Sequence, residues 1–252
     1  MPRRRRGLMD HACYHVTHRC HGRQFLFRFA KDRERYVTLL RETTRRFKIS
    51  VLNYVVTSNH VHLLMWVRKG PELSRAMQFL QGEFGQYYNK RKNREGAFWR
   101  DRYHSTLIES GEHLGRCVFY IDLNMVRAGV VDHPGVWRHC GYHELVGKRQ
   151  RYRAVDLDRL LRCLGMRDVD QFRRWYARTL TEKLASGVGV REAYWTEAFA
   201  VGSEEWVQDI YQRSGFKRKK ILSSPVVVYD HGAGASNGNG IAEAPSAWYI
   251  EG

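Results

Sequence analysis

Two histidines stand one residue apart inside an apolar run of the sequence. His60 and His62 belong to SNHVHLLMW, and the preceding VLNYVV is apolar too, with no Gly or Pro in either segment. This composition is typical of a buried strand, or of two paired strands that meet near residues 57–59. Alternate residues of a strand share a side, so His60 and His62 would face the same way. Two imidazoles fixed in this manner could bind a metal ion; the alternative is a hydrogen-bonded pair at a strand end.

A second group of chemically active residues is predicted on a helix over residues 112–126. One face of this helix is apolar, and the other carries Arg116, Tyr120, Asn124 and Arg127. Tyr120 and Asn124 are therefore one turn apart on the same side. Such a polar stripe could simply be solvated. If the helix packs beside the sheet, the Tyr120 phenol lies near the two histidines, and the Asn124 amide oxygen becomes a third ligand for Mg²⁺ or Mn²⁺.

The elements that must position these residues form a simple order. The hydrophobic pattern predicts a strand, a helix, two strands, a helix, a strand and a helix, which indicates an α+β fold with an antiparallel sheet and helices on one face. In the helix that begins near Pro71, we expect Tyr87 in the core and Tyr88 free to contact a binding partner. The cysteines and histidines of residues 13–21 match no common zinc spacing, and strand alternation would divide them between two faces.

The composition favours a polyanionic partner. The chain has 43 Lys and Arg against 26 Asp and Glu, a formal net charge of +17, which favours nucleic acid first and an anionic membrane surface second. Arginines outnumber lysines, and a guanidinium group can donate two parallel hydrogen bonds to one phosphate. Five cysteines without a CxxC pair indicate reduced thiols. With no membrane span and no secretory signal recognised, we expect a cytoplasmic, nucleoid-associated protein.

We expect DNA contacts from a basic arm near the start of the chain, from the segment before the fourth strand, and from the polar helix face. Arginines supply phosphate contacts there, and a tryptophan offers a surface on which bases could stack. These residues are Arg3, Arg4, Arg5, Arg6, Trp99, Arg100, Arg102, Arg116 and Arg127.

Three segments in order, VLNYVVTSNHVHLLMW, GAFWRDRYHSTLI and FYIDLNMVRAG, resemble the signature blocks of the REP-associated tyrosine transposases. These belong to the single-tyrosine HUH superfamily of single-strand DNA transposases. His60-Val61-His62 matches the family's histidine motif, Tyr120 its nucleophile and Asn124 its third metal ligand. The resemblance covers roughly residues 1–147. Met125 stands where proline is usual, and Arg138-His139-Cys140 stands where serines are common.

The resemblance implies a ferredoxin-like HUH nuclease fold and cleavage of single-stranded DNA by transesterification. Tyr120 would attack the scissile phosphate, with Mg²⁺ or Mn²⁺ bound, and form a 5′-phosphotyrosine link. The implied partner is single-stranded DNA with hairpin-forming palindromic repeats, bound by a monomer or a homodimer. Two alternatives stay open: a hairpin-binding protein that does not cut, and a zinc hydrolase that uses the histidine pair.

The last third of the chain is predicted to be an extension of the catalytic domain. A charge run at residues 147–151 suggests a boundary, which divides the chain into a catalytic domain (1–147), a helical extension (148–230) and a tail (231–252). Apolar periodicity predicts helices over residues 156–164 and 168–184. The tail is rich in Gly, Ala, Ser and Asn, a composition that buries little surface and predicts mobility.

Overall fold

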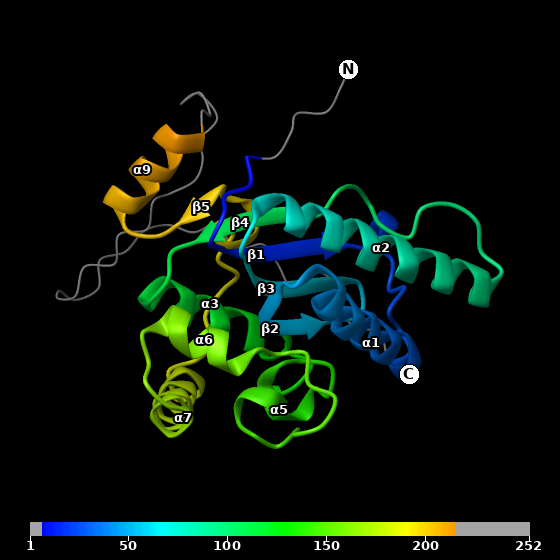
Figure 1. Ribbon diagram of the computed structural model, residues 1–252. Coiled ribbons are helices and arrows are strands. Elements are labelled where there is room, and N and C mark those ends of the chain that lie inside the picture. The colour runs from blue at the N-terminus through cyan, green and yellow to red at the C-terminus, as the bar shows by residue number, and fades with distance from the viewer. Residues whose placement is uncertain (1–6, 215–252) are drawn as a thin grey trace.

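A computed structural model describes residues 7–214 of the chain. Its centre is a five-stranded sheet in the order β2-β3-β1-β4-β5 (Figure 1). β1, β2, β3 and β4 pair antiparallel, whereas β5 runs parallel to β4. The predicted α+β class is confirmed, with β5 as an addition from the extension. The strands are β1 (Ala12–Arg19), β2 (Ser50–Val56), β3 (His60–Val67), β4 (His104–Ile108) and β5 (Ala200–Val201).

Helices cover both faces of this sheet, where the sequence predicted a cover on one. α1 (Ala30–Phe47) and α2 (Gly70–Lys92) lie on one face, and α3 (Glu112–Asp122) and α6 (Leu157–Leu164) lie on the other. Side chains of β1 point alternately to these two faces. Cys13 contacts Cys163 of α6 on one face, whereas His18 on the other face stacks on Trp99, whose indole donates a hydrogen bond to α2. Strands buried on both faces read as nearly continuous apolar runs, as the edge strand β2 and its neighbour β3 do.

The remaining helices follow α3 in the chain. The predicted helix over residues 112–126 is interrupted at Leu123, and its second part is α4. Helices are present at both positions predicted after residue 147, and each begins at an aspartate: Asp156 accepts from the Arg159 amide and Asp168 from the Gln171 amide. These elements are α4 (Asn124–Arg127), α5 (Tyr142–Leu145), α7 (Val169–Ala185), α8 (Tyr194–Glu197) and α9 (Glu204–Ser214), with short 3₁₀ turns at His21–Arg23 and Pro134–Val136.

The prediction for the two adjacent tyrosines of α2 was wrong. Tyr88 is buried against Phe98, whereas Tyr87 is half-buried, with arginine side chains over its ring. The helical period explains the exchange: the apolar stripe continues from Phe84 by four residues to Tyr88, not by three to Tyr87. Both tyrosines lie on the α1 and α2 side of the sheet.

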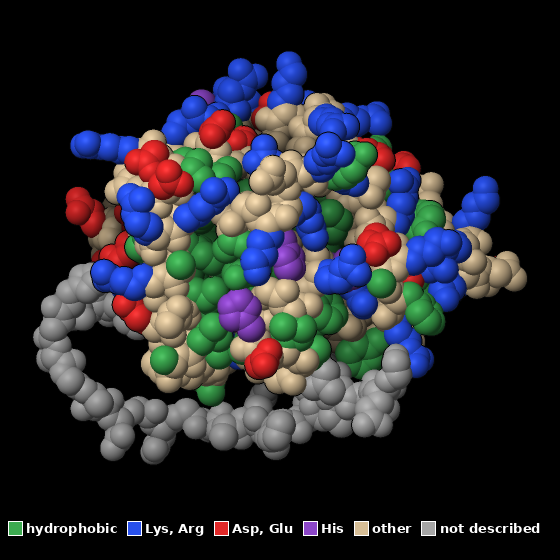
Figure 2. All heavy atoms as spheres, turned by 90° about the horizontal axis from the view of Figure 1, so that it is seen from below, with side chains coloured by type: hydrophobic (Ala, Val, Ile, Leu, Met, Phe, Trp, Pro, Cys, Tyr) green, Lys and Arg blue, Asp and Glu red, His purple; other side chains and the backbone are tan. Residues whose placement is uncertain are grey.

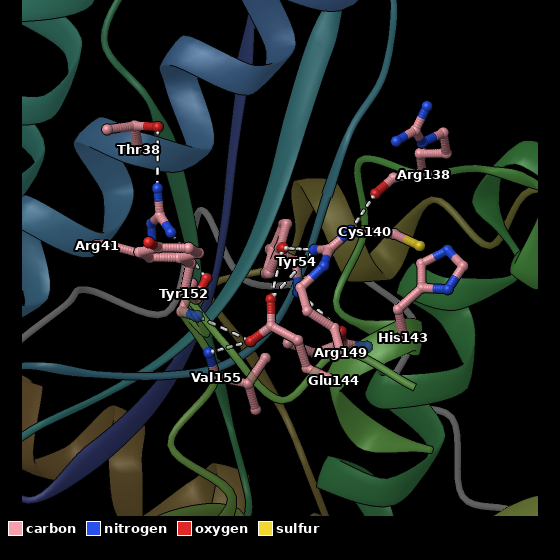
Figure 3. Close-up of polar contacts among 12 residues, drawn as sticks. Thr38, Arg41, Tyr54, Arg138, Cys140, His143, Glu144, Arg149, Tyr152 and Val155 are labelled. Atoms are coloured by element: carbon pink, nitrogen blue, oxygen red, sulfur yellow. Dashed lines mark hydrogen bonds and ion pairs between the residues drawn. The ribbon is translucent and has the colours of Figure 1, made fainter. Parts of the chain in front are cut away.

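A buried carboxylate ties the chain after residue 147 to the edge strand β2. Glu144, on α5, accepts from the Tyr54 hydroxyl at 2.8 Å and from the amides of Ala154 and Val155, also at 2.8 Å (Figure 3). Arg149 approaches the same carboxylate at 3.4 Å. Residues just past the predicted domain boundary are thus hydrogen-bonded into the sheet layer. The division at residue 147 stays a prediction.

Two predicted segments cannot be compared with the structure, and one predicted absence can be checked in part of the chain. The basic arm Arg3 to Arg6 and the tail 231–252 lie outside the described residues. Within residues 7–214, no helix is both long and apolar enough to cross a membrane.

Candidate active site

Four residues singled out in the sequence lie together on the α3 side of the sheet. His60 and His62 project from β3 with ring centroids 4.9 Å apart. The Tyr120 ring, from α3, lies 5.9 Å from that of His62, and the Asn124 amide nitrogen lies 3.3 Å from His62 Nε2. The antiparallel sheet and the α3–α4 junction bring these side chains to one place. Their chemical roles stay predictions.

The environment of His60 leaves one ring nitrogen available as a ligand. Its Nδ1 lies 2.6 Å from Asn59 Oδ1 and 2.9 Å from Thr57 Oγ1. The Thr57 hydroxyl donates its own hydrogen to the His60 carbonyl at 2.8 Å, so both oxygens accept from Nδ1. The neutral ring therefore carries its hydrogen on Nδ1 and a lone pair on Nε2.

This donor set fits a divalent ion. Imidazole nitrogens together with an amide oxygen suit Mn²⁺ or Mg²⁺ and leave positions for substrate oxygens. Among residues 7–214, no group of three or more His, Cys, Asp or Glu side chains has the arrangement of a metal site. The amide of Asn124, beside His62, is a donor of another type.

Burial keeps the histidines of the site neutral. It lowers the pKa of His60 to about 3, with Arg19 and Arg191 adding to the effect, and it lowers the pKa of His62 well below its usual value. Neutral imidazole is the form that ligates metal, so protons do not compete for these nitrogens near pH 7.

Tyr120 is covered by the extension. Its side chain is only 4% exposed, and the Trp195 ring of α8 packs 5.7 Å from its centre. Burial raises the pKa of the Tyr120 phenol, while the guanidinium groups of Arg127 and Arg191 act in the opposite direction. The resting phenol is therefore protonated, and the nearby positive charges favour its ionised form.

Two residues of this site were not predicted. His15, on β1, lies in hydrogen-bond contact with His62, although the sequence offered it only as one member of a weak zinc cluster. Trp195 stands in an aromatic segment of the extension with no spacing that relates it to the histidines. Its carbonyl and its ring both contact the site.

The predicted DNA contacts are spread over the molecule. Among those in residues 7–214, Arg127 is the one beside the Tyr120 ring. Arg116 forms an ion pair with Glu112, and the Trp99 ring stacks on His18 at 4.3 Å. Arg100 and Arg102 are exposed in the segment before β4. Figure 2 shows Lys and Arg side chains distributed widely over the face seen from below.

Residues 9–124 match the family model described as "Transposase IS200 like". This segment is therefore similar to IS200-like transposases. The match begins before β1 and ends at Asn124, so it includes both histidines and Tyr120. The resemblance to tyrosine transposases is confirmed, and with it a transposase-like role in processing DNA. The extension that carries Trp195 lies beyond the matched segment.

Two solved structures are similar at low identity, and the first of them shows the same fold. One, described as the structure of a REP-associated tyrosine transposase bound to a REP hairpin, is 18% identical with a TM-score of 0.50, and the match covers 62% of this chain and 93% of that one. Another, a putative transposase from Deinococcus radiodurans R1, is 17% identical with a TM-score of 0.33, over 46% of this chain and 92% of that one. Among curated proteins no significant match is found.

Proposed function

We propose that this IS200-like transposase is a metal-dependent endonuclease and strand transferase for single-stranded DNA, acting next to hairpin-forming repeats through a 5′-phosphotyrosine intermediate. The observation that carries this proposal is the meeting of a phenol, two neutral imidazoles and an amide at Tyr120, His60, His62 and Asn124. A nucleophile beside hard-metal ligands suits phosphodiester transfer.

In the proposed reaction, the Tyr120 hydroxyl oxygen attacks the scissile phosphorus. A bond forms between that oxygen and phosphorus, and the bond from phosphorus to the 3′ oxygen breaks. The phenol loses its proton and the departing oxygen gains one, which gives a free 3′ hydroxyl. Arg127 beside the ring favours the ionised phenol. His60, His62 and Asn124 would hold Mg²⁺ or Mn²⁺, which supplies charge stabilisation to the phosphate.

The proposed substrate rests on charge and on the related structure. The similar REP-associated transposase binds a REP hairpin, and this chain carries a net charge of +17. We assign its own substrate to single-stranded DNA that folds into hairpins, with phosphate contacts from the arginines named above. A monomer or homodimer acting on cellular DNA in the cytoplasm, at the nucleoid, is consistent with this role.

One observation favours a second candidate, a protein that binds hairpins without cutting them. Tyr120 is 4% exposed and lies under Trp195. A nucleophile covered in this way needs a displacement of α8 or of its own side chain before it reaches a phosphate. Without that displacement, the chain would recognise DNA and leave it intact.

The deciding experiment uses a labelled single-stranded hairpin with a flanking tetranucleotide, incubated with Mg²⁺ or Mn²⁺. We expect a metal-dependent covalent protein–DNA adduct with the wild type, no adduct with Tyr120→Phe, and an undiminished adduct with the control Tyr88→Phe, whose ring lies across the sheet. Binding without an adduct, over a panel of hairpins and both metals, would support the second candidate instead.

A further inference from the structure

A line of three polar groups runs from the extension to the metal-ligand pair. The Trp195 carbonyl oxygen lies 2.8 Å from His15 Nδ1, and His15 Nε2 lies 2.8 Å from His62 Nδ1. The two rings are stacked at 5.0 Å with an interplanar angle of 17°. His15 is fully buried and His62 is 2% exposed, so bulk water does not compete for these bonds.

The chemistry of the end groups fixes the direction of every bond in this line. A carbonyl oxygen only accepts, so His15 Nδ1 carries the hydrogen. A neutral imidazole has one ring hydrogen, which leaves His15 Nε2 as an acceptor. His62 Nδ1 must then donate, and the lone pair of His62 lies on Nε2.

An independent contact gives the same assignment. The amide nitrogen of Asn124, which only donates, lies 3.3 Å from His62 Nε2. Because the Asn124 amide donates to His62 Nε2, that nitrogen must carry the lone pair. The two neighbours of His62, from β1 and from α4, therefore agree on its tautomer.

We propose that His15 is a positioning residue that, anchored by the Trp195 carbonyl, holds His62 in the tautomer whose Nε2 can bind the divalent ion of the proposed function. Partners of this kind orient ligand imidazoles, and their loss typically weakens metal binding roughly 10- to 100-fold. A residue of α8, outside the matched segment 9–124, thereby contributes to the ligand geometry of the transposase domain.

The tautomer can be measured directly on the full metal-free chain. Long-range ¹H–¹⁵N spectra of ¹⁵N-histidine-labelled protein separate the two neutral forms, and a His62→Gln spectrum assigns the signals of His62. We expect the Nδ1–H form of His62 in the wild type and its loss in His15→Phe. His15→Gln retains it, because a glutamine amide accepts from His62 and donates to Trp195. The buried control His139→Gln leaves it unchanged.

Calorimetric titration with Mn²⁺ alone supplies the second readout. We expect affinity to fall roughly 10- to 100-fold in His15→Phe and to recover in His15→Gln. The Nε2–H form of His62 in the wild type, unchanged Mn²⁺ affinity in His15→Phe, or no Mn²⁺ binding by the wild type would overturn the proposal. None of these measurements needs DNA cleavage, so failure to cleave would count against the proposed function alone.

Discussion

The guanidinium of Arg127 lies 4.5 Å from the centre of the Tyr120 ring. Its Nη2 also approaches the Tyr120 carbonyl at 3.4 Å. Arg127 is the last residue of α4, the short helix that follows the break at Leu123, so α3 and α4 present a phenol and a positive charge to one another. A cation in this position stabilises an ionised phenol more than a neutral one.

Replacing Arg127 by glutamine should therefore slow cleavage more than it weakens DNA binding. Loss of one preorganised electrostatic partner typically costs about 10²-fold in rate. Single-turnover adduct formation measures the rate, and hairpin titration measures the affinity. Arg178→Gln, at an exposed position on α7, serves as the control with a near-normal rate. Equal rates for Arg127→Gln and wild type would contradict the role of Arg127.

A buried carboxyl predicts a pH dependence of stability. Asp122 is 2% exposed, the Tyr176 hydroxyl donates to it at 2.6 Å, and burial raises its pKa to about 7. The folded chain holds this proton up to about pH 7, whereas the unfolded chain loses it near pH 4. The contribution of protonated Asp122 to the free energy of unfolding is therefore complete below pH 4. It is lost as the pH rises toward 7, at about 1.4 kcal/mol per pH unit.

Asp122→Asn removes this titration. We expect the wild type to lose stability relative to the variant as the pH rises from 4 to 7, in urea unfolding experiments at several pH values. Exposed Asp158→Asn should follow the wild type throughout. A constant difference between wild type and Asp122→Asn would show that the carboxyl has an ordinary pKa.

The carboxylate of Glu144 should contribute strongly to stability. It accepts from Tyr54 on one oxygen and from two backbone amides on the other. Glu144→Gln replaces one of these acceptors by a donor, which leaves a buried donor without its acceptor and costs about 2 kcal/mol. Urea unfolding would measure this loss. Glu112→Gln, at an exposed ion pair, should change stability by less than about 1 kcal/mol; an equal effect would argue against the network in Figure 3.

The exposed arginines before β4 should set part of the salt dependence of hairpin binding. Each phosphate contact on a single strand adds about 0.7 to the slope of log affinity against log salt. The double variant Arg100→Gln, Arg102→Gln should reduce the slope by about 1.4. Arg178→Gln, with a side chain 84% exposed on α7, is the matched control. An unchanged slope would remove this segment from the DNA interface.

Local patterns in the sequence were sufficient to predict several features. Strand alternation placed His60 and His62 on one side, and they lie so on β3. Apolar periodicity predicted helices at the positions of α6 and α7, because this pattern depends on neighbouring residues alone. The helical period alone did not resolve Tyr87 from Tyr88, since adjacent residues differ by about 100° around a helix.

Other features depend on contacts between distant segments and could not be predicted in this way. His15 faces His62 only because β1 pairs with β3 in one register, with Thr17 opposite His62. Tyr120 was placed on a polar helix face, yet it is buried because α8 packs over it from 75 residues further along the chain. No periodicity within α3 carries that information.

The carbonyl that anchors His15 comes from late in the chain, which has a consequence for biosynthesis. Every side chain proposed to react or to bind metal has been made once residue 124 is added, whereas Trp195 is made 71 residues later. At the usual rate of about 5–20 residues per second, this interval is roughly 4 to 14 s. During that time the nascent protein contains the proposed metal ligands and the nucleophile. It still lacks the Trp195 carbonyl, which orients His62 through His15, and the Trp195 ring, which covers Tyr120.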